Sequence, residues 1–382
     1  MTRYRWVVLA AGTAAQASYS AIWFGIAVLA PALRDEQRLS LGQVGVLIAS
    51  SLAGSVLSLI PWGIAADRFG ERMVLGVGLA GSGAALLAAA HASSFGALAV
   101  LLGIAGLSGA SVQSASGRAV MHWFDASERG LALGIRQTAV PIGGFAASLT
   151  LPHIAAAGGT TWGLRALGLS CFVTAVVGAA LLREGPRPAP PATPSIPPLR
   201  DRAIWILSMG SALVLAPQMC VVGFTVLFLH DRRGLSAGAA AAVLAVVQAL
   251  GVAARIAAGR WSDRMRSRVR PLRRIALAIS VLVAVAAALL SAPLPLLLPV
   301  LVLAGALSMS WNGLSFAAAA ELAGHARSGV AIGLQQTLLN GSGAIMPGLF
   351  GVLVGLTSWQ VGFLAVALFP LAGWRVLAVV KD

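Results

Sequence analysis

Twelve apolar stretches, each long enough to cross a bilayer as a helix, constrain this chain more than any other feature. A bilayer-spanning helix needs about 20 mostly apolar residues. The stretches cover residues 6–33, 41–66, 73–91, 94–123, 129–155, 162–182, 203–229, 237–260, 273–291, 294–322, 328–355 and 358–379. Only 10% of the residues are charged, which is too few to cover the surface of a soluble domain. We therefore predict an all-α integral membrane protein with twelve transmembrane helices.

The formal net charge of +15 would suggest a nucleic-acid partner if the basic residues formed one patch. They lie instead mainly in the short gaps between the apolar stretches. With the N-terminus placed in the cytoplasm, 19 of the 27 Lys and Arg residues fall in cytoplasmic segments and 5 in external ones. Short cytoplasmic loops retain Lys and Arg. We expect a multi-pass protein of the inner membrane with both termini cytoplasmic, the lipid bilayer as a partner and no nucleic-acid partner.

A proline-rich gap divides the twelve stretches into two groups of six. It predicts three parts: an N-terminal bundle of residues 1–182, a cytoplasmic linker of residues 183–202 and a C-terminal bundle of residues 203–382. The two groups also match each other in sequence. A shift of 196 residues places Asp67 on Asp263 and Arg68 on Arg264. Two parallel six-helix repeats around a central site are a recurring transporter architecture.

The loop after the second stretch carries Gly63, Asp67, Arg68, Gly70 and Arg72, and the loop after the eighth repeats its Gly, Asp and Arg. This spacing resembles the signature loop of the major facilitator superfamily, and the resemblance covers essentially the whole chain. It implies two pseudo-symmetric six-helix bundles with these loops as cytoplasmic gates. The alternative is that the charges only set topology and solvate a loop. The residues given a gating role are Asp67, Arg68, Arg72, Glu128, Arg129, Asp263 and Arg264.

The segment from Trp123 to Gly134 resembles the Trp-Phe…Glu-Arg-Gly segment of organic-anion and sugar-phosphate uptake branches of the superfamily. Two patterns of the drug-efflux branches are imperfect. The stretch 101–106 lacks the arginine of their fourth helix, and residues 140–144 only approach their fifth-helix glycine-proline signature. An efflux pump for drug-like compounds or metabolites therefore stays as the alternative function.

Three arginines, Arg118, Arg136 and Arg255, lie inside the expected spans, whereas no Asp or Glu is expected deep in any of them. Buried arginines need a counter-charge, and an anionic substrate supplies one. Arg255 stands eight residues before Asp263, a position that resembles the substrate-binding arginine of monocarboxylate and oxalate branches. The alternatives are that Arg255 and, more readily, Arg118 extend toward the cytoplasm, and that Arg136 pairs with Glu128.

Other polar side chains repeat at helical spacing and predict which helices line a cavity. Pro217 is expected to bend the seventh span, and Trp23 and Trp311 either pack a substrate or fill the bundle. The third, ninth and twelfth spans carry almost no strongly polar group and are expected to face lipid. The further residues expected to contact substrate are Gln16, Tyr19, Trp23, Gln218, Gln248, Trp311, Asn312, Gln336 and Asn340.

No catalytic motif is found in the sequence, so we expect no enzyme, no metal site and no cofactor. Cys171 and Cys220 lie inside apolar stretches, where neither a disulfide framework nor a cysteine metal site is expected. We predict a monomeric secondary transporter that moves a small organic anion by alternating access. Because no buried carboxylate is expected, protons would be carried by the substrate itself or by His122.

Overall fold

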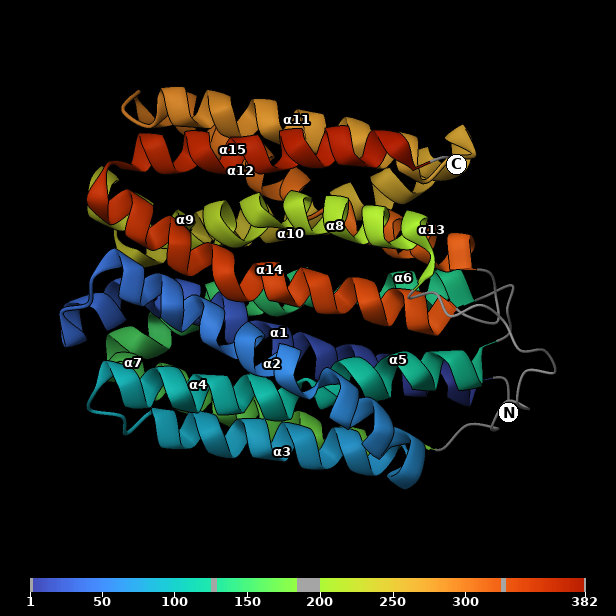
Figure 1. Ribbon diagram of the computed structural model, residues 1–382. Helices are drawn as coiled ribbons and strands as arrows, with labels where there is room; N and C mark the ends of the chain where they lie inside the picture. The colour runs from blue at the N-terminus through green and yellow to red at the C-terminus, as the bar shows by residue number, and fades with distance from the viewer. Residues whose placement is uncertain (1–2, 125–128, 184–199, 324–327, 381–382) are drawn as a thin grey trace. The chain divides into compact units, whose positions relative to one another are not determined.

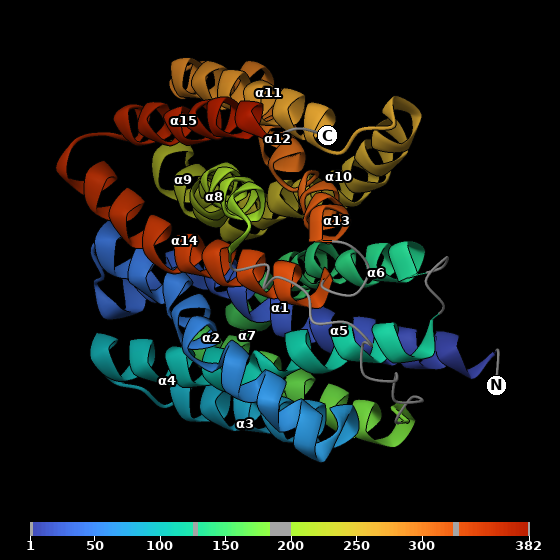
Figure 2. The same cartoon turned by 45° about the vertical axis from the view of Figure 1, so that its right-hand side comes forward.

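The computed structural model describes residues 3–124, 129–183, 200–323 and 328–380, and within these ranges it contains helices and no strands (Figures 1 and 2). The first half holds α1 (Tyr4–Gln37), α2 (Leu41–Phe69), α3 (Glu71–Ala89), α4 (Phe95–Gly109), α5 (Ser111–Trp123), α6 (Arg129–Gln137) and α7 (Ala139–Leu181). The second half holds α8 (Arg202–Pro217), η2 (Gln218–Val222), α9 (Gly223–Arg233), α10 (Ala237–Met265), α11 (Val269–Leu289), α12 (Leu294–Ser308), α13 (Asn312–Ala323), α14 (Ser328–Leu356), α15 (Trp359–Val376) and η3 (Leu377–Val379).

Eleven helical segments of the described residues are long and apolar enough to cross a membrane. The segment Gly134–Leu181 has 48 residues, enough for two crossings. Its helical dihedrals are broken at Gly158 and Gly159, where Gly159 has a φ of 68°. The fifth and sixth predicted stretches thus lie on either side of this break, so that eleven segments account for the twelve predicted crossings.

Several predicted spans are continuous in space but interrupted in their hydrogen bonding. The fourth is divided into α4 and α5 at Ala110, and the tenth into α12 and α13 at residues 309–311. In the seventh, the five-residue π-helix η2 begins directly after Pro217. A proline removes one backbone donor, and the rare π-helical turns occur mostly as single turns inside α-helices. The expected disturbance at Pro217 takes this form.

Contacts group the chain into two compact units. Unit 1 comprises Met1–Ala189 with Val226–Ala245, and unit 2 comprises Pro190–Thr225 with Val246–Asp382. The predicted boundaries at residues 182 and 203 stay a prediction.

In unit 1, α1 packs along α7, and α3 packs between α4 and α7. The crossing of α2 and α4 is especially close, because glycines stand where the two backbones meet. A Cβ added to Gly106 would lie 1.8 Å from Ser51 O, and one added to Gly54 would lie 1.9 Å from Gly103 O. This close packing places polar serines of α2 against α4.

In unit 2, α11 lies beside α15, and α8 packs against both α14 and α15 (Figures 1 and 2). Its core includes an aromatic cluster in which the rings of Phe224 and Phe350 are 4.9 Å apart and both contact Trp359. Large apolar side chains are exposed along α11 and α15, as they are along α3 of unit 1. This is the pattern required of the helices that we expect to face lipid.

Candidate functional site

Arg136 of α6 is buried in unit 1 among neutral acceptors. Its Nε donates to Ser116 Oγ at 2.8 Å, and its Nη2 donates to Gln16 Oε1 at 3.3 Å and to Gln113 O at 3.1 Å. The residue is 9% exposed, and no ion pair joins it to a carboxylate in the described part of the chain. Its expected partner Glu128 lies outside the described residues. The cluster unites Arg136 and Gln16, both expected from the sequence, with two residues that the sequence analysis missed.

Arg118 of α5, the second expected anion ligand, lies near a carboxylate instead. Its Nε is 3.4 Å from Glu71 Oε1, and His122 Nδ1 is 2.8 Å from the same oxygen. Glu71 stands in the first turn of α3 and is only 3% exposed. The expectation that no buried carboxylate exists is therefore wrong at Glu71. The sequence did not predict the burial of Glu71, because it stands at a helix end and is buried by packing against α5 rather than by depth in a span.

Tyr19 and Trp23 of α1 lie together, with their ring centroids 5.2 Å apart in an edge-to-face arrangement. Tyr19 is fully buried, and its hydroxyl bonds with Ser55 Oγ and donates to Gly106 O at 3.1 Å. Trp23 Nε1 has no hydrogen-bond partner in the part of the chain that the structure describes. Within this unit, Tyr19 joins α1 to α2 and α4, whereas the indole N–H of Trp23 is unpaired among the described residues.

In unit 2, Arg255 reaches from α10 to the break between α12 and α13. Its Nε donates to Met309 O at 2.6 Å, and its Nη2 donates to Asn312 Oδ1 at 3.0 Å. Met309 O is available because the helical hydrogen bonding is interrupted at residues 309–311. Trp311 of the same break is fully buried and donates from Nε1 to Ser308 O at 2.8 Å. The structure thus brings the expected pair Arg255 and Asn312 together.

α14 contributes two adjacent glutamines with different surroundings. Gln336, which the sequence analysis selected, donates to Asn340 Oδ1 at 2.9 Å on its own helix. Gln335, which it missed, is fully buried and donates to Ser211 Oγ at 3.4 Å and to Ser315 Oγ. The missed signal was the pair of serines, Ser211 on α8 and Ser315 on α13, whose hydroxyls hydrogen-bond to each other although they lie 104 residues apart in the sequence.

Several buried side-chain amide atoms of unit 2 have no hydrogen-bond partner among the described residues. Both side-chain polar atoms of Gln248, Oε1 of Gln218 and Nδ2 of Asn340 are in this state. Gln218 begins the π-helix η2, and Gln248 shares a face of α10 with Arg255, seven residues further on. Unsatisfied buried polar groups are costly, and a bound ligand or water is the usual explanation.

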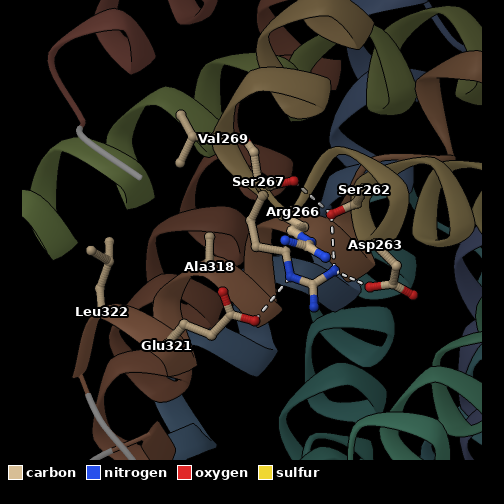
Figure 3. Close-up of a pocket in the computed structure, with 9 residues that line it drawn as sticks. Ser262, Asp263, Arg266, Ser267, Val269, Ala318, Glu321 and Leu322 are labelled. Carbon is tan, nitrogen blue, oxygen red and sulfur yellow. Dashed lines mark hydrogen bonds and ion pairs between the residues drawn. The ribbon is translucent and has the colours of Figure 1, made fainter.

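A pocket of about 500 Å³ lies at one end of unit 2, around the second signature loop (Figure 3). Arg268 donates from Nη1 to Asp263 Oδ1 at 2.5 Å and from Nε to Glu321 Oε1 at 2.9 Å. Partial burial lowers the pKa of Arg268, but the hydrogen bonds and charges of Asp263 and Glu321 outweigh it, so that its pKa is raised overall. Asp263 is thus paired within its own unit, while Arg264 is exposed.

For the other expected gate residues, the structure describes few side-chain contacts. The side chains of Asp67 and Arg129, and all of Glu128, lie outside the described part of the structure. Arg68 and Arg72 are exposed, and the guanidinium of Arg68 lies 5.3 Å from the ring centroid of Phe69. Their gating role stays a prediction.

Comparison with known proteins decides the family. The sequence pattern of the Major Facilitator Superfamily matches residues 12–347. The chain belongs to this superfamily. The transporter is 33% identical over 379 residues to an uncharacterised MFS-type transporter of Mycobacterium tuberculosis strain CDC 1551, covering 98% of this chain and 85% of that protein. It is 23% identical over 231 residues to a hexuronate transporter of Bacillus subtilis, covering 57% of this chain and 55% of that one.

A solved structure shares the fold of the transporter along its whole length. The inward-facing, occupied structure of a bacterial homologue of the human lysosomal transporter Spinster matches it with a TM-score of 0.80 at 18% identity, over 99% of this chain and 97% of that one. The protein is a multi-pass membrane protein with the two-domain fold of the superfamily. It is a secondary transporter that works by alternating access rather than an enzyme.

Proposed function

We propose that the substrate of this transporter is a small organic anion and that Arg136 of unit 1 is its principal anchor. The observation that carries the proposal is a buried guanidinium whose described acceptors, Ser116, Gln16 and Gln113, are all neutral. A charge inside a membrane protein is costly unless a counter-charge accompanies it. A carboxylate or a similar anion supplies that charge and matches the planar fork of arginine.

Arg255 supports the same substrate class from unit 2. Two of its hydrogen bonds end on neutral oxygens, those of Met309 and Asn312. The unpaired amide atoms of Gln248, Gln218 and Asn340 in the same unit are suited to the hydroxyl groups of a polar substrate. The hexuronate transporter that resembles part of the chain is named for a sugar carboxylate, which combines these two kinds of group.

We propose proton coupling through Glu71 and His122 of unit 1. Glu71 Oε1 lies 2.8 Å from His122 Nδ1 and 3.4 Å from Arg118 Nε, and carboxylates and imidazoles inside membrane proteins are the usual members of proton relays. Arg72 follows Glu71 directly, and Asp67 and Arg68 end the neighbouring helix α2. The other helices packed on α3 contribute no further charge here, because α4 and residues 172–181 of α7 contain no titratable side chain.

The basic loops support placing both termini in the cytoplasm and the protein in the inner membrane. Gate roles for Asp67, Arg68, Arg72, Asp263 and Arg264 rest on the duplicated signature loop. We also propose that the protein acts as a monomer. A reporter enzyme that is active only outside the cytoplasm, fused at the C-terminus, should be inactive. An active fusion would reverse the proposed orientation.

The substrate class is tested by melting the purified protein in the presence of matched charged and neutral compounds. Because a ligand that binds only the folded state stabilises it, a hexuronate or a monocarboxylate should raise the melting temperature, whereas the corresponding hexose or amide should not. Uptake of the labelled active compound into proteoliposomes then shows transport. Stabilisation by bulky uncharged compounds, with none by any anion, would overturn the proposal in favour of drug or metabolite efflux.

Coupling is tested with the same proteoliposomes with and without an imposed pH gradient. We expect the gradient to accelerate uptake by the native protein and to have no effect on Glu71→Gln, which should still exchange substrate at equilibrium. Asp35→Asn, at an exposed carboxylate of the same unit, is the matched control and should respond as the native protein does. An undiminished response in Glu71→Gln would remove Glu71 from the coupling mechanism.

A further inference from the structure

The junction of α10 and α11 in unit 2 carries far more positive charge than its counterpart in the other half of the sequence. Between Gly259 and Ile275 the chain has seven arginines and one aspartate. The corresponding segment between Gly63 and Leu79 has two arginines, one aspartate and one glutamate. Both segments hold the same place in the repeat, so orientation in the membrane needs no more arginines in one than in the other. The surplus calls for another explanation.

Among the residues that the structure describes, one of these seven arginines forms ion pairs with carboxylates. Arg268 binds both Asp263 and Glu321. Five others are exposed, and none of them forms an ion pair with a carboxylate in the described ranges. Such a concentration of like charges is unfavourable unless an anion binds to it. The five exposed residues, here called the arginine cluster, are Arg260, Arg264, Arg266, Arg270 and Arg274.

Two tryptophans fix this cluster at the level of a membrane interface. The guanidinium of Arg274 lies 6.0 Å from the ring centroid of Trp261 on α10. The neighbouring Arg273 lies 5.7 Å from the ring centroid of Trp374 on α15 and donates from Nε to Trp374 O at 3.3 Å. Tryptophan is enriched where a bilayer meets water, at the depth of the lipid headgroups. The arginines are therefore held where a headgroup phosphate would lie.

An exposed apolar stripe continues from the cluster along α11. Arg270 and Arg274 are followed on the same helical face by Leu277, Val281 and Val285, which are 37%, 53% and 41% exposed. The adjacent helix α15 repeats the arrangement, with the exposed residues Leu364 and Leu368 below Arg375. The two helices lie side by side (Figure 2). A small soluble anion would not contact these apolar stripes, whereas the acyl chains of a lipid would pack on them.

We infer that the arginine cluster binds the headgroup phosphate of an anionic phospholipid, with Arg270 and Arg274 as its main ligands and the acyl chains along α11 and α15. Basic pockets between membrane helices are suited to such headgroups, and each arginine near the surface adds to the attraction. The site lies on the lipid-facing side of unit 2 and contains none of the residues proposed to bind substrate.

The test titrates phosphatidylglycerol, phosphatidylcholine of the same acyl chains, and inorganic phosphate into the purified protein in detergent and follows its melting temperature. We expect stabilisation by phosphatidylglycerol alone. The double variant Arg270→Gln/Arg274→Gln should bind it roughly thirtyfold more weakly. The control Arg3→Gln/Arg200→Gln removes the same charge at exposed positions outside the cluster and should bind as the native protein does.

Each alternative result would overturn the inference. Equal stabilisation by phosphatidylcholine would show that charge is not recognised, and equal stabilisation by inorganic phosphate would show a site for free anions rather than lipid. An unchanged affinity in the double variant would place the lipid elsewhere. If the double variant aggregates, Arg274→Gln alone is titrated, and a loss of less than twofold contradicts the proposal.

Discussion

Arg136 and Ser116 are held together by a hydrogen bond whose direction is fixed from both sides. Ser116 Oγ donates to Val112 O at 2.5 Å, so its lone pairs are left to accept from Arg136 Nε at 2.8 Å. The guanidinium is thus oriented by a neighbouring helix before any substrate binds. Such preorganisation lowers the entropic cost of binding an anion.

Arg136→Gln should weaken the binding of the anion that stabilises the native protein by at least tenfold. A charge-assisted hydrogen bond is worth about 1.5–3 kcal/mol, and glutamine keeps the polarity of the site without the charge. The measurement is the shift in melting temperature as a function of anion concentration. Arg3→Gln changes the net charge equally at an exposed position. An equal loss of affinity in both variants would show that the net charge of the protein, rather than a contact with Arg136, determines anion binding.

Gly106→Ala should destabilise unit 1, because the added Cβ would lie 1.8 Å from Ser51 O on α2. A backbone oxygen cannot move aside as a side chain can, so α2 and α4 must separate. Overpacking of this kind costs about 1–3 kcal/mol. The separation would also strain the hydrogen bond from Tyr19 to Gly106 O.

Gly96→Ala is the matched control on the same helix, because nothing lies within 4 Å of the position that its Cβ would take. Thermal unfolding in detergent should show a lowered melting temperature for Gly106→Ala and little change for Gly96→Ala. If the two variants have the same melting temperature, the close approach of α2 and α4 at Gly106 is contradicted.

The apolar stretches were sufficient to predict the spans because twenty apolar residues in a row have few other uses. The gap that they leave between the fifth and sixth spans contains Gly158 and Gly159, where the helical dihedrals of α7 are broken. Arg136 and Arg255 could be predicted because charges inside apolar stretches are conspicuous. Gln335 could not, since its partners Ser211 and Ser315 are brought to it only by folding. The burial of Glu71 could not be predicted for the same reason, because it results from the packing of a helix end.

Glu36→Ala should destabilise the kink of α7 by about 1 kcal/mol, the usual cost of losing a helix cap. Glu36 Oε1 accepts from the backbone N–H of Thr160 at 3.1 Å, and Glu36 Oε2 accepts from Thr160 Oγ1. The carboxylate therefore caps the helical segment that resumes after Gly159. Thermal unfolding measures the loss, with Asp35→Ala as a control at the preceding exposed carboxylate. Equal destabilisation by both changes would argue against a specific cap.

Arg268→Gln should destabilise unit 2 by about 1 kcal/mol or less, because Arg268, Asp263 and Glu321 are 28%, 67% and 58% exposed. The raised pKa of Arg268 fixes the pH dependence of this contribution. For a group whose folded pKa is raised, the stabilisation is present in full below the unfolded pKa and is lost only as the pH rises through the folded one. Because the pKa of an arginine lies far above neutral pH in both the folded and the unfolded state, the stabilisation is present in full near pH 7.

The difference in melting temperature between the native protein and Arg268→Gln should consequently be the same at pH 7 and pH 9. Raising the ionic strength at constant pH should shrink it, since partly exposed ion pairs are screened by salt. The control is Arg270→Gln, which changes an exposed arginine with no carboxylate partner in the described structure. In lipid-free detergent it should melt at the same temperature as the native protein at both pH values and at both ionic strengths. A difference that vanished between pH 7 and pH 9 would mean that another group, and not the guanidinium of Arg268, joins α13 to the signature loop.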